Sequence, residues 1–364
     1  MSFPSRAAPT LIGIELVRFA CTLPVLLWHY QHFFYVAGQP VGFEMSAQPG
    51  YALLQPFYLF GYLSVQAFWC LSGFIFFWKY ARPIAEGAVP LRRFAWLRFS
   101  RLYPLHLLTL LLVALMSGWY ERTMGAGFVY QHQDWPHFGL QLLMASDWGP
   151  SIEWSYNGPI WSISLEILVY LVFFALSRLG LIRTWMVLGL IGGTGLVYQL
   201  KLTSHPIVLC LFFFYLGALT CQVHEAMQTR LTARQQSLGL GLALVATGGA
   251  AVLSAQGLLR PMLFVALLTP VAIIALVRWV RPASVWTVRT IESLGHMTYS
   301  SYLWHFPLQL AAALWFMQQP QAMPAREGWW LAAYLGLTYA LALLSYRWIE
   351  APAQRWLRQR GPSH

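Results

Sequence analysis

Residues 11–34 read LIGIELVRFACTLPVLLWHYQHFF, and this stretch decides the fold class. A helix that crosses the roughly 30 Å hydrocarbon core of a bilayer needs about 20 mostly apolar residues, and this run supplies them. The flanking sequence carries no small-residue cleavage site of the kind that a removable signal peptide has. We therefore expect a retained membrane span.

The same kind of apolar run recurs along the whole chain of 364 residues. Hydrophobic residues make up 58% of the sequence and charged residues only 10%, a balance that excludes the water-soluble classes of protein. We predict an all-α integral membrane protein, a polytopic bundle of about ten transmembrane helices. The predicted spans are 11–34, 55–79, 102–119, 159–177, 184–200, 206–222, 237–256, 261–279, 296–317 and 329–346.

The basic residues predict the orientation of the chain. The formal net charge is +11, yet the sequence has no long basic amphipathic helix, so we expect no nucleic-acid partner. If the N-terminus is cytoplasmic, eighteen of the 23 basic residues lie on the cytoplasmic side of the membrane. One, Arg18, lies within a span, and the opposite side receives only Arg122, Lys201, Arg260 and Arg326. The positive-inside rule then predicts that both termini are cytoplasmic.

Two polar excursions between the predicted spans are long. The outer one, 120–158, carries acidic side chains among aromatic residues, and we interpret it as a mouth or lid. The inner one, 80–101, contains five arginines and leads into the third span. The sequence shows no tandem repeat, so we expect residues 1–364 to form a single transmembrane domain with no fused soluble domain.

Glu15, Arg18 and His29 are ionisable residues within the first span. Such groups cost several kcal/mol when they face lipid, so they should face the interior of the bundle. Eleven helical steps return His29 to nearly the face of Arg18, about 16 Å further along the axis. This pattern indicates a deep cation and a titratable imidazole at one site, or else a structural Glu15–Arg18 pair and a hydrogen-bonded core histidine.

Arg98 and Arg101 lie at the cytoplasmic entry to the third span, with Arg92 and Arg93 shortly before them. Arginines three positions apart share a helix face and can hold phosphate groups through forked, charge-assisted hydrogen bonds. The alternative is a positively charged anchor that contacts lipid headgroups.

Ser162 and Glu166 bring a hydroxyl and a carboxylate into the otherwise apolar span 159–177. No cation lies within a helical turn of Glu166, so we predict that its partner comes from another span or that it is protonated. A buried carboxylate without a local partner is more often functional than structural.

Tyr302 and His305 lie in the ninth predicted span. His305 is either a second active-site imidazole or a packed, hydrogen-bonded histidine, and we rank it below His29. Arg347 and Glu350 stand three positions apart at the end of the tenth span, where a local ion pair is the simplest prediction.

Several chemical classes lack their motifs in this sequence. It has no HExxH or other close metal-ligand spacing, no Walker-type glycine loop and no G-x-S-x-G elbow. Neither lysine lies in the middle of a span, where a retinal-type Schiff base would form. Metalloprotease, ATP-driven pump and rhodopsin are disfavoured, and we expect no metal site.

Taken together, these stretches resemble the membrane acyltransferase family 3, which contains bacterial O-antigen and exopolysaccharide O-acetylases. The matching motifs are Glu15 with the Arg18 to His29 spacing, Leu71-Ser72-Gly73-Phe74, the pair Arg98 and Arg101, Trp161-Ser162 with Glu166, and the stretch from Tyr302 to His305. The resemblance implies an acyl-CoA-dependent O-acyltransferase that moves an acyl group, usually acetyl from acetyl-CoA, to a carbohydrate hydroxyl. It also implies polysaccharide O-acetylation in the inner (cytoplasmic) membrane of a bacterium, with no permanently bound cofactor.

The expected roles follow from the motifs and the resemblance together. Arg98 and Arg101 would grip the phosphates of acyl-CoA, with Arg92 and Arg93 as weaker candidates. His29 would deprotonate the acceptor hydroxyl or carry the acyl group itself. Glu166 would orient or charge-balance His29, and Arg18 would hold the thioester arm or polarise its carbonyl. The secondary candidates are Glu15, Ser162, Tyr302 and His305.

A competing hypothesis is a secondary transporter or flippase for a glycan or lipid, in which His29, Glu166 and Arg18 form a proton relay. Many transporters have two related halves with interrupted helices, and this sequence shows no such internal symmetry. A bilayer enzyme of another family, acting on a lipid acyl chain, is a further alternative. Consumption of a thioester would separate an enzyme from a carrier.

Overall fold

The computed structural model describes residues 12–149, 153–281 and 284–362. Within these residues the fold is helical apart from one short antiparallel hairpin, β1 (Tyr35–Val36) with β2 (Gln39–Pro40). The α-helices are α1 (Ile12–Ala20), α2 (Thr22–His29), α3 (Tyr51–Phe60), α4 (Ser64–Phe76), α5 (Arg82–Ala85), α6 (Leu91–Met124), α7 (Trp135–Leu142), α8 (Trp161–Arg178), α9 (Thr184–Gln199), α10 (Ile207–Arg230), α11 (Ala233–Ala255), α12 (Pro261–Trp279), α13 (Val285–Trp315), α14 (Gly328–Ser345) and α15 (Ala351–Gln359). Short turns of 3₁₀- or π-helix join several of them: η1 (Tyr30–Phe34), η2 (Met45–Ala47), η3 (Gly61–Leu63), η4 (Phe77–Ala81), η5 (Gly158–Ile160), η6 (Pro320–Ala322) and η7 (Tyr346–Glu350).

The predicted all-α polytopic membrane fold is confirmed. Of the residues that the structure describes, eight helical stretches are long and apolar enough to cross a membrane: Ile12–Phe34, Tyr51–Ala85, Leu91–Met124, Gly158–Arg178, Ile207–Arg230, Ala233–Ala255, Pro261–Trp279 and Gly328–Gln359. The other two predicted spans also fall on helices, α9 and α13. At 16 residues α9 is about 24 Å long, which is short for a bilayer core.

The first predicted span differs from the prediction of one continuous helix. It is divided at Cys21 into α1 and α2, and α2 ends at His29. Pro24 explains the division, because proline lacks the backbone N–H that would bond back to residue 20 and its ring crowds the preceding turn. Arg18 and His29 therefore lie on separate helices rather than on one straight helix face.

The inner excursion 80–101 is mostly helical, in agreement with the shared helix face predicted for Arg98 and Arg101. Helix α6 begins at Leu91 and continues without a break into the third span, so all four candidate arginines lie on it. With 34 residues, α6 is about 51 Å long and exceeds the hydrocarbon thickness. Its arginine-bearing first turns can therefore project beyond the hydrocarbon while remaining helical.

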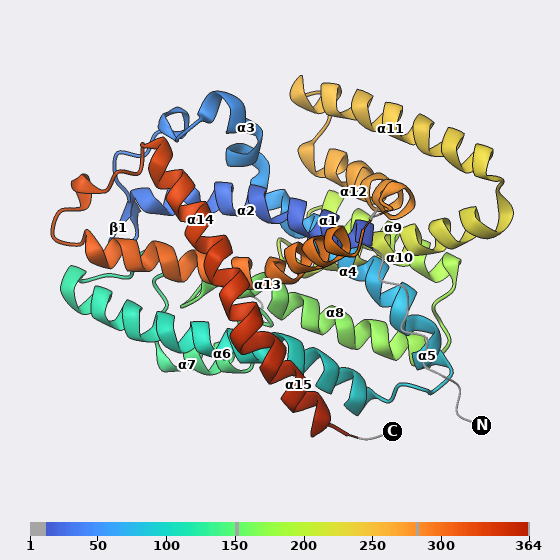
Figure 1. Cartoon of the computed structure of the whole chain (residues 1–364), viewed down its shortest axis with the longest axis horizontal. Helices are drawn as coiled ribbons and strands as arrows, with labels where there is room; N and C mark the ends of the chain where they lie inside the picture. The colour runs from blue at the N-terminus through green and yellow to red at the C-terminus, as the bar shows by residue number, and fades with distance from the viewer. Residues whose placement is uncertain (1–11, 150–152, 282–283, 363–364) are drawn as a thin grey trace.

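Helix α13 packs against α1, α6 and α14, and α11 lies along one edge of the molecule against α12 (Figure 1). Helices α4 and α10 approach each other closely. A Cβ atom at Gly73 would meet the backbone carbonyl of Phe214, and one at Gly217 would meet that of Cys70. Small residues at such contacts let membrane helices approach each other closely.

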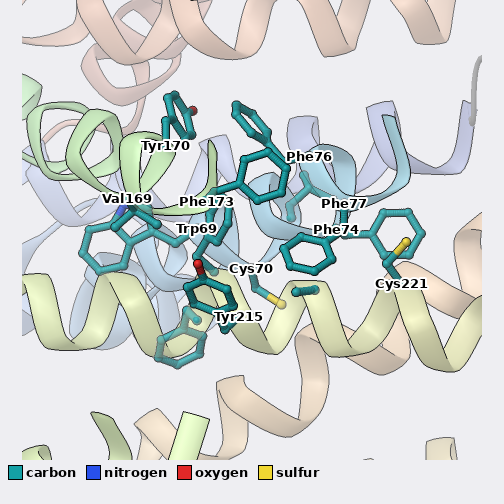
Figure 2. Close-up of a cluster of buried hydrophobic side chains, with 14 of the residues drawn as sticks. Trp69, Cys70, Phe74, Phe76, Phe77, Val169, Tyr170, Phe173, Tyr215 and Cys221 are labelled. Atoms are coloured by element: carbon teal, nitrogen blue, oxygen red, sulfur yellow. The ribbon is translucent and has the colours of Figure 1, made fainter. Parts of the chain in front are cut away.

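A cluster of aromatic side chains fills the space between α4, α8 and α10 (Figure 2). The rings of Phe76 and Tyr170 stack with centroids 4.2 Å apart, and Phe173 meets Phe76 edge-on. Aromatic pairs in these geometries contribute about 0.5–1.5 kcal/mol beyond the area that they bury. Phe76 and Tyr170 also face the cavity described next, so the cluster forms one of its walls.

Candidate active site

A cavity of about 190 Å³ opens among α1, α4, α6, α8 and α13. Most of its lining is apolar or aromatic, and the polar side chains in it are few. These include six residues predicted from the sequence: Arg18, Arg98, Arg101, Ser162, Glu166 and Tyr302. The fold thus brings residues from four separate predicted spans or their ends to one place.

Glu166 has partners both on its own helix and on other helices. The hydroxyls of Ser72 on α4 and of Tyr170 one turn further along α8 lie near its carboxylate, which is also in the field of Arg98 and Arg18. The two hydroxyl oxygens are themselves 3.3 Å apart. Ser72 belongs to the Leu-Ser-Gly-Phe element of the sequence, so this element has a defined place in the cavity.

Arg98 is held by aromatic side chains. One guanidinium nitrogen donates to the Tyr80 hydroxyl at 2.8 Å, and the guanidinium carbon lies 5.0 Å from the Phe76 ring centroid and 5.1 Å from that of Tyr80. Its Nε is buried without a hydrogen-bond partner among the described residues. This placement favours a ligand in the cavity over a lipid headgroup as the partner of Arg98.

The other arginines of α6 divide into two groups. Arg101 lines the cavity beside Arg98. Arg92 is exposed and Arg93 half-buried, and in the part of the chain that the structure covers neither lines the cavity. They lie on the same helix within about two turns of Arg98.

Glu15 and Arg18 form the ion pair that the sequence indicated, with 3.0 Å between Arg18 Nη1 and Glu15 Oε2. Glu15 lies directly over Gly295 of α13, where an added Cβ would meet the Glu15 side chain.

The predicted local pair of Arg347 with Glu350 is wrong. Glu350 is buried and accepts a hydrogen bond from Ser300 on α13 instead.

Three histidines meet deep in the bundle, and we call His29, His32 and His305 the imidazole trio. The ring centroids of His29 and His305 are 4.7 Å apart, and those of His29 and His32 are 5.2 Å apart. All three side chains are buried. His29 is not among the described residues that line the cavity. Tyr302 does line it, and the centroid of the Tyr302 ring lies 5.7 Å from that of His305, so Tyr302 lies between the cavity and the imidazole trio.

The hydrogen bonds of the trio define which ring nitrogens carry protons. His29 Nδ1 lies 2.9 Å from the Val25 carbonyl, and His305 Nδ1 lies 2.7 Å from the Tyr302 carbonyl. A carbonyl oxygen only accepts, so in both rings Nδ1 is the donor and Nε2 keeps its lone pair. The Nε2 of His305 has no partner among the described residues. In both rings Nε2 therefore keeps a lone pair that can accept a proton.

His32 and Gln309 complete the trio, and the sequence analysis missed both. His32 Nδ1 donates to the Gln309 side-chain oxygen at 3.0 Å, and the Gln309 amide donates to the His29 carbonyl at 2.8 Å. The spacing in the sequence could have indicated them. His32 follows His29 by three positions and Gln309 follows His305 by four, and residues at these spacings share one face of a helix. Gln309 therefore ties two of the three histidines together.

Ser162 forms a hydrogen bond with Tyr302. The Tyr302 hydroxyl donates to the Pro159 carbonyl at 2.7 Å, so toward the Ser162 hydroxyl, 2.9 Å away, it accepts. The Ser162 proton is thereby engaged. The Ser162 hydroxyl therefore helps to fix the position of the Tyr302 hydroxyl.

Comparison with known proteins agrees with the expected family. A family model described as "Acyltransferase domain" matches residues 11–347. The acyltransferase MdmB of Streptomyces mycarofaciens is 33% identical over 168 residues, which are 45% of this chain and 38% of that protein. No solved structure matches.

The family match covers nearly the whole bundle, including the cavity, the imidazole trio and every residue predicted to act in them. The chain therefore belongs to the membrane acyltransferase family 3.

Proposed function

We propose that this protein transfers an acyl group, acetyl in the simplest case, from acyl-CoA to a hydroxyl of a carbohydrate or glycan acceptor. The observation that carries the proposal is the single cavity in which Arg18, Arg98, Arg101 and Glu166 converge beside Tyr302, the residue that leads to the imidazole trio. We place this reaction in the inner membrane of a bacterium.

The donor end of the site is the arginine-lined part of the cavity. Phosphate groups pair well with guanidinium groups, and Arg98 is already oriented by Tyr80 and Phe76. A volume of about 190 Å³ is small for a nucleotide but suits the narrow pantetheine arm. The nucleotide would then lie toward the first turns of α6, where Arg92 and Arg93 add positive charge.

The chemical step uses the lone pair of an imidazole. His29 Nε2 takes the proton of the acceptor hydroxyl, and the oxygen forms a bond to the thioester carbonyl carbon. The carbon–sulfur bond breaks, and the CoA thiolate leaves and recovers the proton from the imidazolium. In the two-step variant His29 Nε2 attacks the carbonyl carbon, the carbon–sulfur bond breaks and the CoA thiolate leaves. The acceptor hydroxyl then attacks the acylated imidazole, the carbon–nitrogen bond breaks, and the hydroxyl proton passes to the thiolate. Arg18, on the donor side of Tyr302, holds the thioester arm as it extends toward His29.

The test is turnover of acetyl-CoA by the full-length protein purified in detergent, followed as free CoA thiol against a panel of glycans. We expect thiol release that depends on a glycan acceptor and is abolished in His29→Ala. The matched control is His205→Ala, since His205 lies in the loop before α10 and contacts the Gly149 carbonyl. No thiol release with any acceptor, together with glycan or lipid movement across vesicles, would favour the transporter. Normal turnover by His29→Ala would exclude the proposed base.

A further inference from the structure

The outer excursion holds a second cluster of ligand-type side chains, which the proposed acyl transfer does not use. His132, His137 and Glu153 each offer one nitrogen or oxygen atom, and these atoms all lie within 4.8 Å of one another. The ring centroids of His132 and His137 are 5.0 Å apart, and the two rings are tilted by 31°. The cluster consists of two imidazoles and one carboxylate, which is a common ligand set for transition metals.

Asp134 fixes the orientation of His137. One of its oxygens, Oδ1, accepts from the backbone N–H of His137 at 2.9 Å as the N-cap of α7, and it also lies 2.7 Å from His137 Nδ1. An ionised carboxylate only accepts, so both ring nitrogens donate, Nδ1 to Asp134 and Nε2 to Glu153 Oε2 at 3.0 Å, and a metal would take the place of the Nε2 proton. A histidine that donates Nδ1–H to a carboxylate while Nε2 faces the metal is the usual second-shell arrangement of metal sites.

The two segments that carry the cluster are fastened to each other. The Tyr156 hydroxyl donates to the Asp134 carbonyl at 3.0 Å, and the Gln141 side chain donates to the Ser155 carbonyl at 2.9 Å. These bonds hold the backbone near Glu153 against α7. The cluster therefore does not depend on long side chains meeting by chance at the ends of free loops.

We propose that His132, His137 and Glu153 bind a divalent transition metal, with Zn²⁺ as the best fit and water in the fourth position. Tetrahedral zinc with bonds of about 2.0–2.1 Å places its ligand atoms about 3.3 Å apart, so the cluster needs only side-chain rotation to close. Glu153 is half exposed, which leaves it room to rotate. The bound metal joins α7 to the segment that leads into α8, the helix that carries Ser162 and Glu166 into the cavity.

The test is metal binding by the full-length protein in detergent, purified with a tag that contains no histidine, treated with EDTA and then freed of it. Zn²⁺ is titrated against a chromophoric chelator, and Co²⁺ is added separately to observe visible d–d absorption. We expect one Zn²⁺ per chain, a tetrahedral Co²⁺ spectrum and a higher thermal midpoint with Zn²⁺. None of these readouts depends on acyl transfer.

Variants assign the site. His132→Ala, His137→Ala and Glu153→Gln should each weaken Zn²⁺ binding at least tenfold, and His205→Ala should leave it unchanged. Asp134→Asn keeps an N-cap side chain but loses the carboxylate, and it should weaken binding by about 10–100-fold. His132 and Glu153 are exposed, so their variants report on the site even if His137→Ala does not fold. Binding below one equivalent, or wild-type affinity in His132→Ala and Glu153→Gln, would overturn the proposal.

Discussion

Replacement of Arg98 separates donor binding from chemistry. Arg98→Ala removes a guanidinium that faces the cavity, and a charged hydrogen bond to phosphate is worth about 1.5–3 kcal/mol. We therefore expect the KM for acyl-CoA to rise about 10- to 150-fold, because each 1.4 kcal/mol is a factor of ten. The maximal rate at saturating donor should stay near that of the wild type, since the imidazole trio is untouched.

Two further variants make this prediction specific. Tyr80→Phe keeps the ring beneath Arg98 but removes the hydroxyl that accepts from it at 2.8 Å, so the KM should rise by a smaller factor, about 2- to 10-fold. Arg92→Ala removes an exposed arginine outside the cavity lining, and any effect should be small and should disappear at high salt.

The assay is steady-state turnover with varied acyl-CoA, paired with calorimetric titration of CoA. His29→Ala is the opposite case, with CoA affinity near that of the wild type and no turnover, so additional donor cannot restore it. Unchanged CoA affinity in both Arg98→Ala and Arg101→Ala would refute the argument and leave these arginines as contacts to lipid headgroups.

Three other predictions test the parts of the fold around the site. Gln309→Leu removes the acceptor for one imidazole of the trio and the donor to the carbonyl of another, so the maximal rate should fall at least about tenfold with the KM for acyl-CoA unchanged; a changed KM with a normal rate would contradict this. Gly217→Ala sets a Cβ against the Cys70 carbonyl and should destabilise the protein by about 1–3 kcal/mol in thermal unfolding, whereas Gly249→Ala, in open space on α11, should be neutral or stabilising; equal midpoints would contradict the close contact. Burial raises the pKa of Asp147 to about 6, partly offset by the hydrogen bond from the neighbouring serine hydroxyl, so the folded state holds its proton more tightly than the unfolded state and stability falls as pH rises from about 4 to 6. Asp147→Asn should therefore raise the unfolding free energy by up to about 3 kcal/mol at pH 7.5 and by much less at pH 4.5, and a gain independent of pH would exclude this cause.

The fold was largely predictable because the bilayer imposes one length and one composition on every span. The predicted spans differ from the observed helices where the apolar stretch and the helix do not have the same bounds. The first turns of α6 are too polar for a hydropathy window, yet nothing in 91–101 ends a helix, so the helix begins well before the apolar run. In the first span the reverse holds, because Pro24 interrupts an apolar stretch that hydropathy treats as continuous.

It was predictable that Arg18 and Glu166 face the interior of the bundle, because ionisable side chains in apolar helices cost free energy when they face lipid, and both line the cavity. Their partners on other helices were not predictable, since hydrogen bonds between helices depend on packing that no local pattern records. His32 and Gln309 show the limit, because their bond joins residues that are 277 positions apart.

The proposed donor site and the imidazole trio lie on two sides of Tyr302, and this position constrains how transfer occurs. The Tyr302 ring lines the cavity on one side and approaches His305 on the other, with its hydroxyl fixed by Ser162 and the Pro159 carbonyl. The thioester of a donor bound in the cavity must therefore extend past the edge of this ring to reach His29. A buried ring held by two hydrogen bonds does not move freely, so the acyl arm has to extend beside it. In the proposed mechanism Tyr302 thus separates the arginine-lined cavity from the imidazole trio, and it would keep the phosphates of the donor away from the nitrogen proposed as the base.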